Sequence, residues 1–377
     1  MRKNSQTLTT QSIPTLIKQL AIPASTGMFF NTMYNVVDTF YAGLISTQAI
    51  SALTLSFMIF FLIIGFGYGF SSAITALLGN AFGKKKYKLA TIYAHKGLIF
   101  VPLIGVILSL IGYFFAPSLF ILLGAKEDYL NLSLEYINPI LFGSVFFMFN
   151  FSLNSILVAT GDTKTYRNSL IFGFFANLVL NPLLMYGFLF IPAMGLSGIA
   201  IATVLIQIIN MGYLLYKVLQ TKLIHFEKLD YFSPNFRVYK QFLNQGIPSS
   251  LNMLTMGIGS LILTYFVSHY GVNAVAGYGI GFRVEQLMLL PALGLSTAVL
   301  ALVSNNYGAK RYDRVIETMK VSLKYGFIIS TFGIIILTLL GKVIISLFDS
   351  NPIVVNFGIS YLLIEIWIFY AYIVLFV

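Results

Sequence analysis

Asp38 is the residue whose type and setting most strongly indicate chemistry. Between Lys18 and Lys84 it is the one charged side chain, in a stretch that is otherwise mainly apolar, small or hydroxylic. If this stretch crosses a bilayer, an ionised carboxylate there is costly unless polar groups or a proton satisfy it. Asp38 is therefore a functional candidate, and the chemistry it could perform is binding of a proton or of a small cation.

Amides and a hydroxyl stand near Asp38 at helical spacing. Asn31, Asn35 and Asp38 are at i, i+4 and i+7, and Tyr34 lies four residues before Asp38, which places all four on or beside one stripe of a helix. Low-dielectric surroundings disfavour the charged carboxylate, so Asp38 can load a proton near neutral pH. Alternatively, carboxylate, amide and hydroxyl oxygens are the hard ligands that a sodium ion takes.

Other chemistries lack the residues they need. The chain has no cysteine, which excludes disulfides and thiol centres. Its three histidines, His95, His225 and His269, belong to separate loops or helix ends, so we expect no metal site from them. No Ser/His/Asp set, His/Glu metal motif or paired aspartate is present, and we therefore expect neither an enzyme nor a cofactor. The Gly65, Gly67, Gly69 cluster lacks the ending of a phosphate loop and indicates close helix packing.

The elements that must position these residues are membrane helices. The chain is 58% hydrophobic and 9% charged, whereas soluble domains have about 25% charged residues. The composition predicts an all-α polytopic membrane protein. The net charge of +11 resides in short loops between apolar runs, so it does not indicate nucleic-acid binding. The first apolar run is too long for a cleaved signal peptide.

Ten apolar runs have the length of a membrane span, about 20 residues or more. They cover residues 14–44, 51–81, 92–115, 129–160, 166–190, 194–218, 239–268, 273–306, 315–341 and 353–377. With the N-terminus inside, 20 of the 23 basic residues fall in inner segments. Because basic residues are retained on the cytoplasmic side, we expect a multi-pass protein of the plasma (inner) membrane with a cytoplasmic N-terminus.

The chain also matches itself when Gly69 is aligned with Gly294, an alignment that we call the repeat register. Nine of nineteen residues are identical between 69–87 (GFSSAITALLGNAFGKKKY) and 294–312 (GLSTAVLALVSNNYGAKRY), with matches in the loop as well as in the helix. An offset of six helices keeps both halves in one orientation, which predicts two lobes related by an axis along the membrane normal with a cavity near the midplane. We assign residues 1–221 to the first lobe and 222–377 to the second.

The second lobe is expected to be incomplete. In the repeat register the last residue, Val377, corresponds to Ser152, which lies in the fourth helical run of the first lobe. The counterparts of the fifth and sixth runs are therefore expected to be missing. On this expectation, the sequence is a truncated one, and an inactive fragment is one alternative for its function.

Several segments resemble the multidrug and toxic compound extrusion (MATE) transporters. They are NVVDTFYAGL (35–44), LLGNAFGKKKYKLA (77–90), LVATGDTKTYRN (157–168) and GFRVEQLMLLPALGLSTAVLALVSNNYGAKRYDR (281–314). The resemblance implies two lobes of six helices and export of organic cations and other amphiphiles in exchange for protons or sodium ions. It favours the branch named for the DNA-damage-inducible F protein, which has its coupling acid on helix one.

The same resemblance implies roles for particular residues. Ion coupling falls to Asp38 with Asn177 and Asn181, which are themselves spaced i, i+4, and with Thr203. The substrate cavity is expected to include Asn31, Tyr34, Asn35, Tyr136 and Asn154, and Pro23 is expected to allow helix one to bend. We expect small, amphiphilic cationic substrates, contact with membrane lipid and a monomer. The alternative for the amides is that they join helices by hydrogen bonds.

Two further acids and one rival function stay open. Arg283 and Glu285 are expected to form a structural ion pair, and the sequence does not decide the role of Glu365. The rival is a lipid-linked oligosaccharide flippase of the same superfamily. It is disfavoured because Arg283 is the only arginine that could lie at membrane depth to hold pyrophosphate.

Overall fold

The long elements of the protein are α-helices throughout the part of the chain that the computed structural model describes, residues 7–123, 125–190, 192–225, 231, 233–348 and 351–377. One helical turn at residues 7–10 comes first. The helices that follow are α2 (Ile13–Ile45), α3 (Thr47–Gly83), α4 (Tyr87–Leu122), α5 (Glu127–Ala159), α6 (Lys164–Tyr186), α7 (Gly195–Gln220), α8 (Phe236–Ser268), α9 (Val272–Gly308), α10 (Tyr312–Ser346), α11 (Pro352–Glu365) and α12 (Ile368–Phe376).

Each predicted apolar run corresponds to a helix or, for the last run, to a bent pair of helices. Among the described residues, eight helices are long and apolar enough to cross a membrane, and nine if α11 and α12 are one span bent by 52°. The expectation of ten such spans is wrong for α2, which is long enough but less apolar than the others. The reason is its content of Lys18, Asp38 and many amide and hydroxyl side chains.

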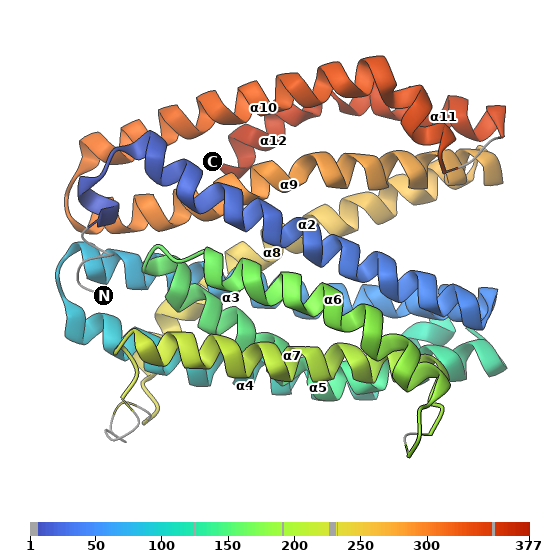
Figure 1. The fold of residues 1–377 in the computed structure, drawn as a ribbon, viewed down its shortest axis with the longest axis horizontal. Helices are drawn as coiled ribbons and strands as arrows, with labels where there is room; N and C mark the ends of the chain where they lie inside the picture. Colours follow the sequence, from blue (N-terminus) through green and yellow to red (C-terminus); the bar gives the residue numbers. More distant parts are fainter. Residues whose placement is uncertain (1–6, 124, 191, 226–230, 232, 349–350) are drawn as a thin grey trace.

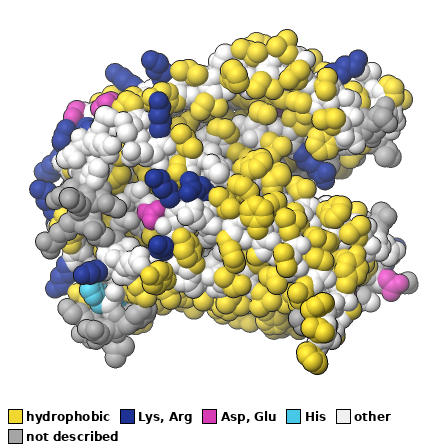
Figure 2. Space-filling view, in the orientation of Figure 1, with side chains coloured by type: hydrophobic (Ala, Val, Ile, Leu, Met, Phe, Trp, Pro, Cys, Tyr) yellow, Lys and Arg dark blue, Asp and Glu magenta, His cyan; other side chains and the backbone are white. Residues whose placement is uncertain are grey.

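The helices lie along the long axis of the molecule (Figure 1). Helices α3 to α7 occupy one side and α9 to α12 the other, while α2 and α8 run between them. The turns after α3 and α9 lie at the same end, where lysine and arginine side chains gather (Figure 2). We call this the basic end. At the opposite end the surface is hollowed between the two sides (Figure 2).

The turns after α3 and α9 are built alike. Lys85 and Lys310, which are paired in the repeat register, have left-handed backbones with φ of 56° and 59°. The N–H of each donates to the carbonyl three residues earlier, at 2.8 and 3.0 Å. A lysine at such a position interacts favourably with the helix C-terminus, although glycine would adopt the conformation at lower cost.

Next to these turns, α3 and α9 cross with their backbones in contact. A Cβ atom on Gly83 would lie 2.0 Å from the Asn305 carbonyl oxygen, and one on Gly308 would lie 2.2 Å from that of Asn80. The repeat register pairs the two glycines with each other and the two asparagines with each other, so each contact has a reciprocal. Only glycine allows this approach, which brings the two sides of the bundle into backbone contact at the basic end.

Candidate ion-binding site

Asp38 lies on the buried stripe of α2, where this helix packs against α6 and α7. Tyr34, Asp38 and Ala42 follow one another at intervals of four residues and are all buried, as one face of a helix requires. Only 3% of the Asp38 side chain is exposed. The carboxylate therefore depends on protein groups for its hydrogen bonds.

Three neutral side chains donate those hydrogen bonds. Asp38 Oδ1 accepts from Asn177 Nδ2 and from Asn181 Nδ2, both at 2.8 Å, and Oδ2 accepts from Thr203 Oγ1 at 3.3 Å. The two asparagines are fully buried on α6. They also bond to each other, each Nδ2 donating to the other Oδ1, at 3.3 and 3.2 Å.

Two tyrosines complete the surroundings of Asp38. The Tyr34 hydroxyl is buried next to Asn177 and Thr203, but neither contact has the geometry of a hydrogen bond. Tyr136, on α5, lies close enough to interact electrostatically with Asp38 and is also buried. No lysine or arginine bonds to Asp38 in the described part of the chain. The site is thus a carboxylate held only by amide and hydroxyl dipoles.

This set of groups can accommodate a cation as well as a proton. An asparagine presents either its N–H₂ or its carbonyl oxygen, depending on the rotation of its last bond. With the amides as they stand, they stabilise a negative carboxylate. With the amides reversed, their oxygens would join the carboxylate, the Thr203 hydroxyl and the Tyr34 hydroxyl as ligands for a sodium ion.

The remaining predicted residues are not part of this hydrogen-bond network. Asn31 is exposed, and Asn35 Nδ2 donates to the Asn31 backbone carbonyl at 2.9 Å. Asn154 is half-buried on α5, and its Oδ1 has no hydrogen-bond donor among the residues that the structure describes. Pro23 is buried inside α2, and the helix continues through it. The roles of these residues in a substrate cavity or in bending stay predictions.

Comparison with known proteins places this chain and its fold in a family. The MatE family model matches residues 23–183 and 248–377, which cover Asp38, Asn177 and Asn181. The chain belongs to the MatE family. The resemblance to the MATE transporters at the level of the family is thereby confirmed, and the chain is a multi-pass membrane protein.

Relatives in the MatE family include transporters. The probable multidrug resistance protein YoeA of Bacillus subtilis is 29% identical over 326 residues, covering 86% of this chain and 70% of YoeA. A FAD transporter of Shewanella oneidensis is 25% identical, covering 96% of this chain and 80% of that protein. The solved outward-facing conformation of a multidrug resistance MATE family transporter superimposes with a TM-score of 0.89 at 26% identity, covering 97% of this chain and 81% of that one.

A second buried acid of this MatE protein lies on α9. Glu285 is 2% exposed and accepts hydrogen bonds from the Tyr361 hydroxyl and, at 3.1 Å, from the Tyr372 hydroxyl. The predicted ion pair between Glu285 and Arg283 is wrong, because residues two apart on a helix point to different sides and Arg283 is exposed. Glu365 lies close enough to interact electrostatically with Glu285. Sequence reasoning missed the tyrosine partners because they come from helices far along the chain.

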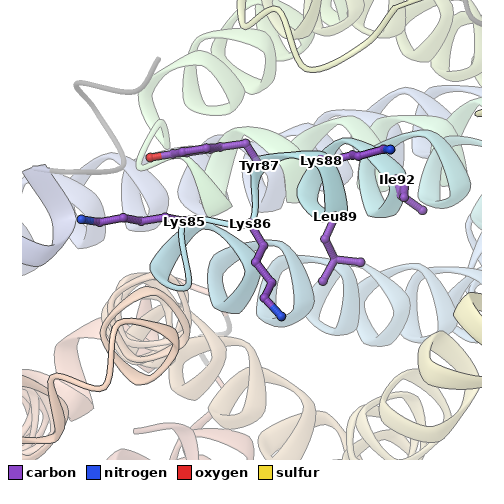
Figure 3. A pocket seen from close by; sticks show the side chains of 6 residues that line it. All are labelled: Lys85, Lys86, Tyr87, Lys88, Leu89 and Ile92. Atoms are coloured by element: carbon purple, nitrogen blue, oxygen red, sulfur yellow. The ribbon is translucent and has the colours of Figure 1, made fainter.

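A pocket of about 510 Å³ at the basic end is separate from the Asp38 site. It is formed by Lys85, Lys86, Tyr87, Lys88, Leu89 and Ile92, around the start of α4 (Figure 3). The three lysine side chains point in different directions (Figure 3), so they do not converge on one bound group. Asp38, by contrast, is in the last third of α2, toward the opposite end.

Proposed function

We propose that this protein is a secondary active antiporter that exports small amphiphilic cations in exchange for a proton or a sodium ion bound at Asp38. Its membership of the MatE family and the transporters among its relatives support a transport role. The observation that carries the coupling assignment is the buried Asp38 carboxylate, bonded to two amides and a hydroxyl and, among the described residues, to no basic group.

The ion acts by favouring one conformation over the other. A ligand shifts a two-state equilibrium only through a difference in its affinity for the two states. Asp38, Asn177 and Thr203 come from α2, α6 and α7, so a rearrangement of α2 changes the number of groups around the carboxylate. A kink near Pro23, where the proline leaves one helical carbonyl without its donor, gives α2 a place to bend.

The transport cycle alternates between two openings. Contact of α3 with α9 at Gly83 and Gly308 supports a closed basic end, and the hollow at the opposite end supports an opening there. On this proposal the basic end faces the cytoplasm of a plasma membrane, since lysines and arginines are retained on that side. Residues 1–221 and 222–377 form two lobes, related by an axis along the membrane normal, that rock against each other in a monomer.

Efflux of a fluorescent organic cation from proteoliposomes tests the proposal. The parent protein and Asp38→Asn are compared under an imposed proton gradient and, separately, under an imposed sodium gradient. Asp128→Asn, at an exposed position on α5, is the matched control. We expect Asp38→Asn to abolish the response to the coupling gradient while Asp128→Asn retains it.

Two results would contradict the proposal. Coupled efflux that is undiminished in Asp38→Asn would remove Asp38 as the coupling residue. Efflux by the parent that responds to neither gradient would remove antiport altogether. The gradient that drives efflux in the parent also identifies the ion.

A further inference from the structure

Residues 7–11, ahead of α2, cross the basic end and contact both sides of the bundle; we call them the N-terminal tie. The Leu8 side chain is 3% exposed and belongs to one buried apolar cluster with Val158 of α5 and Leu302 of α9. It also reaches the turn after α5, where a Cβ on Gly161 would lie 3.0 Å from Leu8 Cδ2. The tie therefore lies across the joint between α5 and α9.

The backbone of this tie is bound by a buried cation on α10. Arg314 is 7% exposed, and its Nη2 donates to the Gln11 carbonyl at 2.6 Å and to the Leu8 carbonyl at 3.4 Å. Its Nε donates to Asn306 Oδ1 at 2.9 Å, and Asn306 Nδ2 donates to the Leu8 carbonyl at 3.2 Å. The carbonyls at the end of a helical turn lack intrahelical donors, so a guanidinium is a fitting partner for them.

The surroundings of Arg314 contain charges of both signs, yet no hydrogen bond to a carboxylate is present among the described residues. Asp313 and Glu317 on α10 favour its charge, and Arg311 opposes it. Asp313 pairs instead with Arg311, at 3.4 Å on the surface. The hydrogen bonds of the buried guanidinium thus go to the tie and to Asn306, which concentrates its stabilising effect on that contact.

The internal repeat shows that the residues of this contact have no polar counterparts in the first half of the chain. The repeat register pairs Arg314 with Leu89 and Asn306 with Ala81. Both polar groups that bind the tie therefore stand where the first half of the chain has apolar residues. Asn305, which also joins the halves by donating to the Ala159 carbonyl at 3.1 Å, does have its counterpart, Asn80.

The same register pairs Leu8 with Ser233, in the segment that leads into α8. The Ser233 carbonyl accepts a hydrogen bond from the ammonium of Lys96, which is on α4 and 3% exposed. Helix α4 is the counterpart of α10, so each leading segment is bound through a backbone carbonyl by a buried cation on the other half. The two cations are not counterparts in the repeat register. One is a lysine and the other an arginine, and Lys96 pairs with Val321, which lies further along α10 than Arg314.

We propose that Arg314 and Lys96 are crossed clasps that hold the basic end shut, each by binding the segment that leads into the first helix of the other half. Opening this end separates α9 and α10 from α5, and the N-terminal tie cannot then keep both its Leu8 packing and its Arg314 bonds. Arg314 is the stronger clasp, because it makes three hydrogen bonds. The segment that Lys96 binds connects the two halves along the chain, so it stays attached to both halves even without the Lys96 bond. This role rests on the alternating access of the proposed function.

Spin-label distances across both ends of the protein in lipid nanodiscs test the proposal. Since the chain has no cysteine, Lys88→Cys with Lys320→Cys reports the basic end, and Asn131→Cys with Asn273→Cys reports the opposite end, all at exposed positions. We expect Arg314→Gln to increase the population open at the basic end roughly tenfold, since hydrogen bonds to a charged group change an equilibrium by about that factor. The opposite end should close to the same extent.

Control variants separate a clasp from a general loss of structure. Arg311→Gln and Lys240→Gln, both at exposed positions, should leave both distances unchanged, and Lys96→Gln should give a smaller shift than Arg314→Gln. Leu8→Ala removes the other attachment of the tie, so it should shift the distances in the same direction. The double variant with Arg314→Gln should shift them little further than Arg314→Gln alone. Leu8→Ala and Arg314→Lys also carry the test if Arg314→Gln does not fold.

The result that would overturn the proposal is a folded Arg314→Gln protein whose distances match the parent, or one in which both ends broaden without a reciprocal change. Because these distances are measured without transport, they are informative whatever the efflux assay gives. A shift in Arg314→Gln combined with uncoupled efflux by the parent would retain the clasp and reject the antiport mechanism.

Discussion

At the scale of single residues, the arrangement around Asp38 explains how an acid is tolerated inside an apolar bundle. Two amide N–H₂ groups and a hydroxyl supply hydrogen bonds without supplying charge. A lysine or arginine partner would hold the carboxylate in its charged form. Neutral amide and hydroxyl dipoles stabilise that form less strongly, so the carboxylate can still bind a proton or a cation. The absence of a bonded lysine or arginine in the described chain is therefore the feature that suits Asp38 to reversible ion binding.

The two asparagines on α6 should set the activity of Asp38. Asn181→Ala removes a buried 2.8 Å hydrogen bond to Asp38, and we expect ion-driven efflux to fall about tenfold, as for loss of a hydrogen bond to a charged group. Asn131→Ala, at an exposed position on α5, is the matched control and should change efflux less than twofold, since a surface change has little energetic effect. Equal losses in both variants would show that the network does not set the activity of Asp38.

At the scale of elements, hydropathy and spacing predict most of the fold. The apolar runs locate every long helix, because a bilayer span needs a long apolar segment whatever its neighbours are. They do not predict the 52° bend between α11 and α12. The site follows from the resemblance, which associates Asn177, Asn181 and Thr203 with Asp38.

Contacts between distant helices are what the sequence does not reveal. The tyrosine partners of Glu285 and the carbonyl partners of Arg314 come from segments 76 to 306 residues away, and no local pattern specifies them. Arg314 itself leaves one sequence signal, an arginine where the repeat has Leu89. A mismatch within a well-matched repeat is thus a useful indication of a specific role.

The crossing of α3 and α9 should tolerate no side chain at Gly308. A Cβ there would lie 2.2 Å from the Asn80 carbonyl oxygen, so Gly308→Ala must separate two backbones, at a cost of about 1–3 kcal/mol. We expect a clear fall in the apparent melting temperature of the purified protein. Gly212→Ala, on α7 with open space around it, should be neutral or stabilising, because alanine restricts the unfolded chain and favours helix.

Pro23 permits a separate test of α2 as a moving element. Pro23→Ala restores an N–H inside the helix and so favours an unbent α2. We expect the variant to be at least as thermally stable as the parent but to export substrate several-fold more slowly, since a conformational step limits many such cycles. Unchanged efflux would show that bending at Pro23 is not part of the cycle.

At the scale of the whole molecule, the two halves share a scaffold but differ in their buried acids. Asp38 pairs by the repeat with Leu263, and Glu285 lies in the second half with two tyrosine hydroxyls donating to it. Asp38 is bonded to amides that can turn their oxygens to a cation, whereas Glu285 is bonded to tyrosines that anchor α11 and α12 to α9. This contrast predicts that ion coupling belongs to the first half and that Glu285 is a structural acid.

The glutamine variant of each acid separates these roles. Glu285→Gln keeps an oxygen that can accept from Tyr361 and Tyr372, so efflux should retain its dependence on the coupling gradient. Glu285→Ala leaves the hydroxyls of two half-buried tyrosines without this acceptor, and we expect a lower apparent melting temperature, as for unsatisfied groups at up to about 1–3 kcal/mol each. Asp38→Asn should show the opposite pattern, with little change in melting temperature and no gradient dependence. If Glu285→Gln instead abolished that dependence while remaining folded, coupling would have to be assigned to both halves of the protein.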